Sequence, residues 1–309
     1  SLQLFPSDEA IWNWADEGIV ELCQLNWDYT LPYAYSFYQR AMLNVRYCKE
    51  FLDVYAADSD IPDIQKYRDQ VRGLRAMNYY YLIDLYRNPG VVWDDSPTDD
   101  KSWKPSQIGA EALFDKIVAE LIDLSENGNL DETPSMATYG RVTRPVINTL
   151  LAKMYLNAEA WFGTPMYDKA EKACKDIMDI GAYSIEDSYS TNFDIKNEDS
   201  KENIFVILYD RVYTSGDSNS FYLHTLTLEA ASQATFNIPA APWSGFLCQP
   251  DFFQTYAEQD LRRSQSWLYG PQVDLSGKDL GFEYTPVFPE EKYYNSNGGR
   301  GTYDGARCW

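Results

Sequence analysis

The residues of this chain whose types and spacing best suit ligand binding are tryptophans beside hydrogen-bonding side chains. They occur in polar, loop-like segments such as IWNWADEG, LNWDYT and PAAPWSG. An indole has a flat apolar face, and a neighbouring amide or carboxylate supplies hydrogen bonds. The candidate ligand-binding residues are Trp12, Asn13, Trp14, Asn26, Trp27, Asp28, Trp93 and Trp243. Trp103 is a further loop tryptophan.

This combination fits the recognition of an uncharged sugar. A pyranose ring has an apolar face of C–H bonds and a rim of hydroxyl groups, so an indole covers the face while Asn, Asp or Arg satisfies the rim. Burying roughly 100 Å² of such a face contributes on the order of 2 kcal/mol before ordering costs. Several rings along one surface then hold a polymer by adding modest terms. The alternative for each ring is that it fills a gap beneath its own loop.

The sequence gives little support for covalent catalysis or for a metal site. His224 is the only histidine, and nothing around it suggests a Ser-His-Asp or Cys-His arrangement. The five cysteines are far apart and predict neither a disulfide framework nor a zinc site. Adjacent acids such as Asp94-Asp95 are typical of a solvated loop. The sequence therefore predicts no catalytic residue, no metal site and no cofactor.

The charge balance excludes some partners. The chain has 26 basic and 47 acidic residues, a formal charge of -21. This charge repels phosphate backbones and anionic lipid headgroups, so nucleic acid is excluded as a partner and direct adsorption to a membrane is disfavoured. No stretch approaches the ~20 apolar residues of a membrane span. The chain opens at Ser1 without an initiator Met, which suggests a piece of a processed protein.

Hydrophobic periodicity predicts five helices in the first part of the chain. Their expected ranges are 35–56, 63–87, 109–125, 143–161 and 166–180. The second contains Tyr79, Tyr80, Tyr81 and Tyr86 on several sides, which predicts a central helix covered by its neighbours. The last two form a helix–turn–helix unit about as long as a tetratricopeptide repeat.

The residue composition changes after residue 181. The segment ENIFVILYD, residues 202–210, is a strand candidate because it is rich in aromatic and β-branched residues. A helix is predicted for 250–263, and the segment from residue 270 has the composition of a loop. The predicted fold is mainly α, a tetratricopeptide-like repeat scaffold with a loop-rich insertion and a few short strands.

Four stretches resemble the SusD/RagB family, the surface glycan-binding lipoproteins of Bacteroidetes outer membranes. They are FPSDEA, RAMNYYYLIDLYRNPGVV, the helix pair RPVINTLLAKMYLNAEAW with YDKAEKACKDIMDIGAYSI, and QPDFFQTYAEQDLRR. They occur in the family's order between about residues 5 and 263. The departures are a missing lipidated N-terminal Cys, a missing C-terminal section and an Asn-Pro-Gly turn at 88–90 where the family commonly has Gly after Tyr.

The resemblance implies one SusD-like domain over 1–309 that is incomplete at both ends. Residues 35–181 would form the helical scaffold and 182–309 the ligand-facing region. It implies capture of a glycan, delivery to a SusC-like TonB-dependent transporter, and an outward-facing position on the outer membrane through a lipid anchor outside this chain. It also implies that the protein is not an enzyme. Two alternatives remain, an α-helical glycoside hydrolase with paired carboxylates and a repeat scaffold that binds only protein.

Overall fold

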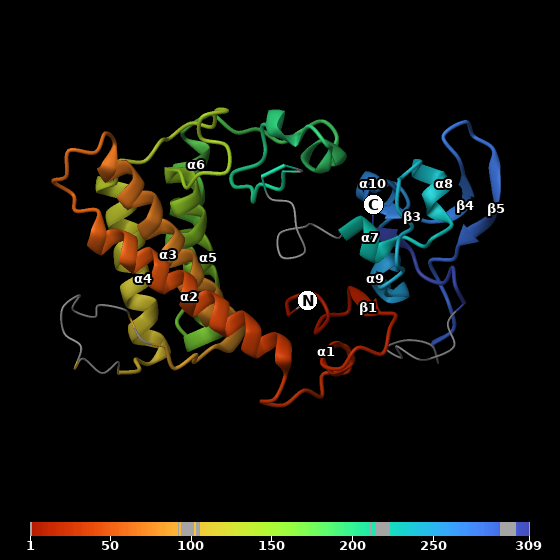
Figure 1. The fold of residues 1–309 in the computed structure, drawn as a ribbon, viewed down its shortest axis with the longest axis horizontal. Coiled ribbons are helices and arrows are strands. Elements are labelled where there is room, and N and C mark those ends of the chain that lie inside the picture. The colour runs from red at the N-terminus through yellow and green to blue at the C-terminus, as the bar shows by residue number, and fades with distance from the viewer. Residues whose placement is uncertain are drawn as a thin grey trace. The chain divides into compact units, whose positions relative to one another are not determined.

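The computed structural model describes residues 2–91, 93, 102, 106–210, 212–213, 223–290 and 301–308. It divides the chain into two compact units (Figure 1). We call Ser36–Asp187 with Asp194–Leu208 the helical unit, and Ser1–Tyr35, Ser188–Phe193 and Tyr209–Trp309 the loop unit. The loop unit is therefore discontinuous in sequence, because the helical unit is inserted into it.

The helical unit is built from long consecutive helices, labelled in Figure 1. They are α2 (Pro32–Val54), whose first turn belongs to the loop unit, α3 (Ile64–Tyr86), α4 (Ala110–Asn127), α5 (Arg144–Phe162) and α6 (Tyr167–Met178). A short 3-10 helix, η2 (Asn197–Asp199), follows later in the chain. These bounds confirm the five predicted helices to within a few residues.

Local sequence explains where α5 begins and ends. Pro145 occupies the first turn, where a missing N–H costs nothing. Gly163 follows the last turn with φ 73°, and its N–H donates to the carbonyl of Glu159. This left-handed conformation suits glycine and turns the chain toward α6.

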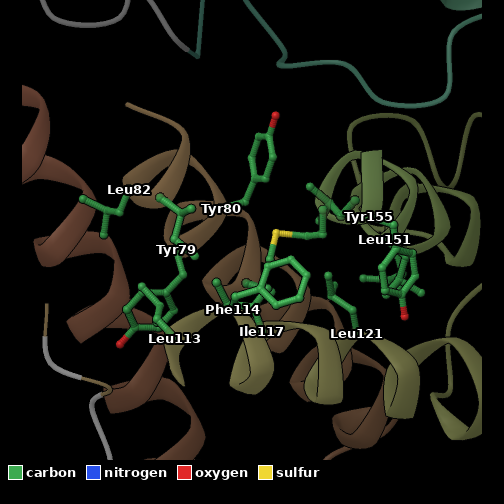
Figure 2. Packing of buried hydrophobic residues seen from close by; sticks show 14 of the residues in the cluster. Tyr79, Tyr80, Leu82, Leu113, Phe114, Ile117, Leu121, Leu151 and Tyr155 are labelled. Carbon is green, nitrogen blue, oxygen red and sulfur yellow. The ribbon is translucent and has the colours of Figure 1, made fainter. Parts of the chain in front are cut away.

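The core of the helical unit lies between α3, α4 and α5 (Figure 2). Tyr79 is fully enclosed, and Tyr80 is buried with its ring beside Trp161 of α5, at a centroid distance of 6.1 Å. Burial raises the pKa of Tyr80 to about 12. The tyrosine-rich helix is thus confirmed as a central, packed one.

A close helix crossing depends on Gly73 of α3. A Cβ atom at this position would lie 2.8 Å from Ile147 Cδ1 and 2.8 Å from Val142 Cγ1. Real Cβ contacts of this length are sterically excluded, so the absence of a side chain lets α3 approach α5 closely.

Charged side chains join α3 to α4 at the edge of this core. Arg72 donates to the carboxylates of Glu120 (3.2 Å) and Asp123 (2.6 Å). Arg75 donates to the same Glu120 oxygen at 2.6 Å. Asp69 is almost fully buried and accepts from Arg72 and from the backbone N–H of Asn129. Each buried carboxylate therefore has a partner, as stability requires.

The loop unit contains short strands and short helices. Strand β1 (Ala10–Trp12) pairs antiparallel with β2 (Phe246–Cys248), with Trp12 opposite Phe246. Strand β3 (Trp267–Leu268) pairs with β6 (Arg307–Cys308), and β4 (Gly270–Val273) forms a hairpin with β5 (Asp279–Tyr284). The helical segments are α1 (Ile19–Cys23), η1 (Tyr189–Phe193), α7 (Leu223–Thr227), α8 (Ser232–Phe236), α9 (Pro250–Gln254) and α10 (Leu261–Ser266).

Arg307 anchors the C-terminal part of the loop unit. Its side chain is fully buried, lies 5.2 Å from the Tyr284 ring centre and donates to the carbonyls of Phe246, Thr302 and Asp304. Burial lowers its pKa. These contacts tie residues 301–308 to β2.

Three predictions of local structure were wrong. Residues 202–210 form no strand, because Ile204 and Phe205 pack against the helical core instead of pairing with a neighbour. The helix predicted for 250–263 is two helices, because the Asp260 carboxylate accepts the N–H of Arg262 and starts α10 anew. The segment from 270 includes the β4–β5 hairpin, whose turn is stabilised by hydrogen bonds to Asp274.

Candidate functional site

Strand β1 positions the first group of predicted residues. Trp12 is only 6% exposed, and its indole N–H donates to Asp16 Oδ2 at 2.6 Å. Its ring contacts Phe5 and Trp14 edge to face, at centroid distances of 5.5 Å and 5.0 Å. A ring enclosed in this way cannot stack on a ligand, so Trp12 acts as a support for its neighbours.

Trp243 lies on a segment bonded to two neighbours. Its backbone N–H donates to Thr225 O at 2.7 Å, and the next residue, Ser244, donates to Leu228 O at 2.9 Å. On the other side, Asn13 Nδ2 donates to Ser244 O at 3.1 Å. The Trp243 side chain is nevertheless 50% exposed. The structure therefore holds an indole at the surface on a fixed backbone.

Gly245 couples Trp243 to the buried support. A Cβ atom at Gly245 would lie 2.9 Å from Trp12 Cη2. The Gly245 carbonyl accepts the N–H of Asn13 at 2.7 Å. The chain thus brings Trp12, Asn13, Trp14 and the Trp243 segment together, although they are more than 200 positions apart. We call Asn13, Trp14 and Trp243 the indole shelf.

The loop between α1 and α2 presents a second aromatic surface, which we call the 24–30 loop. Every residue of this loop is exposed. Trp27 is 45% exposed, and Asn26 and Asp28 flank it. Asp28 Oδ1 accepts the N–H of Thr30 at 2.8 Å and its hydroxyl at 2.6 Å. These bonds hold the loop in shape and lower the pKa of Asp28, so this carboxylate is ionised at neutral pH.

Tyr29 was missed by the sequence analysis. It follows Trp27 by two positions and is 97% exposed, the largest exposure of any aromatic residue in this loop. The alternation of aromatic residues in NWDYT was the available signal, because exposed segments that carry large rings have a recognition role more often than a packing role.

Trp93 belongs to the helical unit. It stacks on Tyr79 at 5.0 Å, with Arg75 5.0 Å and Lys116 5.4 Å from its ring centre. Its faces are therefore occupied by its own protein, and Trp93 belongs to a different unit from the other candidates. Trp103 lies outside the described residues.

A pocket of ≈ 620 Å³ lies between α4, α5 and α6. Its polar groups are largely engaged with one another: Ser125 donates to Asn148 at 2.6 Å, and Lys172 lies 2.7 Å from Asp176. Its lining residues include no tryptophan. The two aromatic surfaces of the loop unit are therefore better candidates for ligand binding than this pocket.

Comparison with known proteins identifies the class of fold. No family model matches the chain. A SusD-like protein from Bacteroides fragilis superposes with a TM-score of 0.75 and 17% identity, covering 100% of this chain and 64% of that one. Surface glycan-binding protein A from Bacteroides thetaiotaomicron, solved with laminarihexaose, gives a TM-score of 0.69 and 21% identity, covering 86% and 56%. The fold is a tetratricopeptide-like helical scaffold with a loop-rich region.

Sequence similarity agrees with the fold. The starch-binding protein SusD of Bacteroides thetaiotaomicron is 28% identical over 226 residues, which are 71% of this chain and 39% of that protein. In both sequence and fold the chain is similar to SusD-like proteins. It spans 39% of the length of this curated relative.

Proposed function

We propose that this chain captures an oligosaccharide or polysaccharide by stacking sugar rings on Trp27 and Trp243. The observation that carries the proposal is a pair of half-exposed indoles, each held by a hydrogen-bonded backbone. Asn13, Asn26 and Asp28 supply hydrogen bonds to the sugar rim, while Trp12 supports the indole shelf. The sugar is released unchanged, because capture is an equilibrium.

The names of the similar proteins support this ligand class. One is called starch-binding and another was solved with laminarihexaose. We further propose delivery to a SusC-like TonB-dependent transporter from an outward-facing position on the outer membrane, with the lipid anchor outside this chain. In the described parts, no helix has the length and hydropathy of a membrane span. Co-purification of the transporter from outer membranes tests this part of the proposal.

The hydrolase alternative gains nothing from the electrostatics. A glycosidase acid needs a raised pKa. Among the described carboxyl groups with a resolved shift, the pKa is lowered in each case, by hydrogen bonds from neighbouring side chains. A turnover assay on oligosaccharides separates hydrolysis from binding.

Two tryptophan substitutions test the binding site. We expect Trp243→Ala and Trp27→Ala each to weaken glycan binding by about tenfold, because each removes one stacking surface. Both should change the free energy of unfolding by less than ~1 kcal/mol, since the rings are exposed. A glycan array followed by calorimetric titration provides the affinities. Tyr29→Ala should give a smaller loss of affinity.

Tyr47→Ala is the matched control, because Tyr47 is an aromatic residue of α2 that is 59% exposed and lies in the helical unit. It should leave affinity unchanged. Wild-type affinity in both tryptophan variants would refute the proposed site, and a large loss of stability would assign the rings to packing.

A further inference from the structure

Both segments that carry the exposed indoles lack positive charge. Residues 1–39 and 212–261 contain no Lys or Arg. They contain eleven acidic residues, which are Asp8, Glu9, Asp16, Glu17, Glu21, Asp28, Asp217, Glu229, Asp251, Glu258 and Asp260. A ligand at either surface therefore meets no Lys or Arg from these segments.

Elsewhere in the loop unit the described positive side chains are already engaged, and Arg211, Lys292 and Arg300 lie outside the described residues. Its described residues include four, Arg262, Arg263, Lys278 and Arg307. Arg307 is buried against backbone carbonyls, and Arg262 lies 2.6 Å from the carboxylate of Asp260. Arg263 lies over the ring of Phe253 at 4.7 Å. Lys278 lies in the β4–β5 turn near Asp274, whose pKa is lowered by the hydrogen bond from the Ser276 side chain, by that from the Lys278 backbone N–H and by the charge of Lys278.

Negative charge lies beside each aromatic surface. Asp28 adjoins Trp27 and is exposed. The Glu229 carboxylate is directed elsewhere, because it accepts the N–H of Ala230 at 2.6 Å and interacts electrostatically with Tyr284 and Arg307. Asp16 accepts the indole N–H of Trp12, which supports the indole shelf. Protein sites for carboxylate or sulfate groups use Arg or Lys to pair with them, whereas the described residues beside the two surfaces include the acids Asp28 and Asp16.

We infer that the site selects uncharged glycans and rejects those that carry uronate or sulfate groups. The inference rests on the proposed function, because it names the ligand class of the same aromatic surfaces. Stacking supplies the attraction in either case, since a uronate and its parent sugar share the same apolar faces. Repulsion between the ligand's anions and the local carboxylates then decides between them.

The test compares ligands that differ only in charge. A glycan array carries each neutral oligosaccharide beside its C6-carboxyl, sulfated and C6-amino derivatives. At low salt we expect the carboxyl and sulfated forms to bind at least about tenfold more weakly than the neutral form, and the amino form to bind no more weakly. At ~1 M salt the difference in affinity between the anionic and neutral forms should become smaller, because the Debye length falls to about 3 Å.

A charge-neutralised variant sharpens the result. The substitution Asp28→Asn should raise the ratio of anionic to neutral affinity several-fold. Glu171→Gln, at an exposed acid of α6 in the helical unit, should leave that ratio unchanged. The ratio is measured within each protein, so a general loss of affinity does not affect it.

The possible failures are distinct. Equal or tighter binding of the carboxyl or sulfated forms by wild type overturns the inference and leaves glycan capture standing. A ratio that does not change in Asp28→Asn also overturns it. Binding of no glycan on the array overturns the proposed function and the inference with it.

Discussion

In the helical unit Tyr79 is fully enclosed and Trp161 is 8% exposed, whereas in the loop unit Trp27 and Trp243 keep about half of their surface in water. The difference does not come from residue type. Tyr79 and Trp161 lie on long helices within the helical core, while Trp27 and Trp243 lie on hydrogen-bonded loops outside the two small cores of the loop unit. The exposure of these four rings therefore follows the element that carries each one.

Each unit also has a glycine at a close approach, and the two serve different ends. Gly73 lets two helices approach and so affects packing alone. Gly245 lets the Trp243 segment approach the buried Trp12 and so affects the placement of a candidate binding residue. Substitutions in the two units should therefore separate stability from affinity.

The largest expected effect is on the helical core. Leu121→Ala removes a fully buried side chain between α3, α4 and α5, and should lower the free energy of unfolding by about 2–5 kcal/mol. Glycan affinity, measured well below the unfolding transition, should not change. Urea denaturation measures the stability. Leu156→Ala, at an exposed leucine of α5, is the control and should lie within ~0.5 kcal/mol of wild type.

The next substitution, Gly245→Ala, should have a smaller effect on stability and should also affect binding. Gly245→Ala places a methyl group against the Trp12 ring and should destabilise the protein by about 1–3 kcal/mol. It should also weaken glycan binding, because the Trp243 segment must move. Thermal unfolding and calorimetric titration check the two parts. Gly109→Ala, which meets open space, is the control. Unchanged affinity in Gly245→Ala would show that Trp243 does not depend on this contact.

The smallest effect concerns pH and the helical unit alone. The hydrogen bond from Arg72 lowers the pKa of Asp123 below its ordinary value of 3.8. A lowered folded-state pKa stabilises the protein above pH 3.8, and this stabilisation is lost as pH falls through the folded value. Asp123→Asn should therefore cost less than ~1 kcal/mol near neutral pH, because the carboxylate is half exposed.

The same comparison at about pH 2 should show a smaller difference between wild type and Asp123→Asn, since the stabilisation is lost as Asp123 takes up a proton in the folded state. Urea denaturation at the two pH values measures it. A constant difference across this range would mean that the amide disturbs packing and not charge.

Local patterns predicted the helical unit because helices form from contacts three and four residues apart. The wrong predictions lie where distant residues decide. Residues 202–210 have a strand's composition but no strand partner, and Asp260 interrupts an otherwise continuous helical segment. The type of residue in the site was predictable, because Trp beside Asn or Asp is visible in the sequence.

Which indoles are exposed was not predictable, because exposure depends on pairing between β1 and β2. Trp12 and Trp14 look equivalent to Trp27 in the sequence, yet Trp12 is enclosed by Phe5 and Trp14. Trp93 likewise gave no sign that Tyr79 and Arg75 would cover it.

The pairing of β1 with β2 also sets an order of assembly on the ribosome. Ala10 can pair with Cys248 only after most of the chain has been synthesised. Helices α3, α4 and α5, by contrast, pack against helices that are adjacent to them in sequence. Contacts that are close in sequence form early, and distant ones form late. We therefore expect the nascent chain to complete its helices while the N-terminal segment still lacks its partner. The surface proposed to hold sugar is then among the last features to appear, when translation has passed β2.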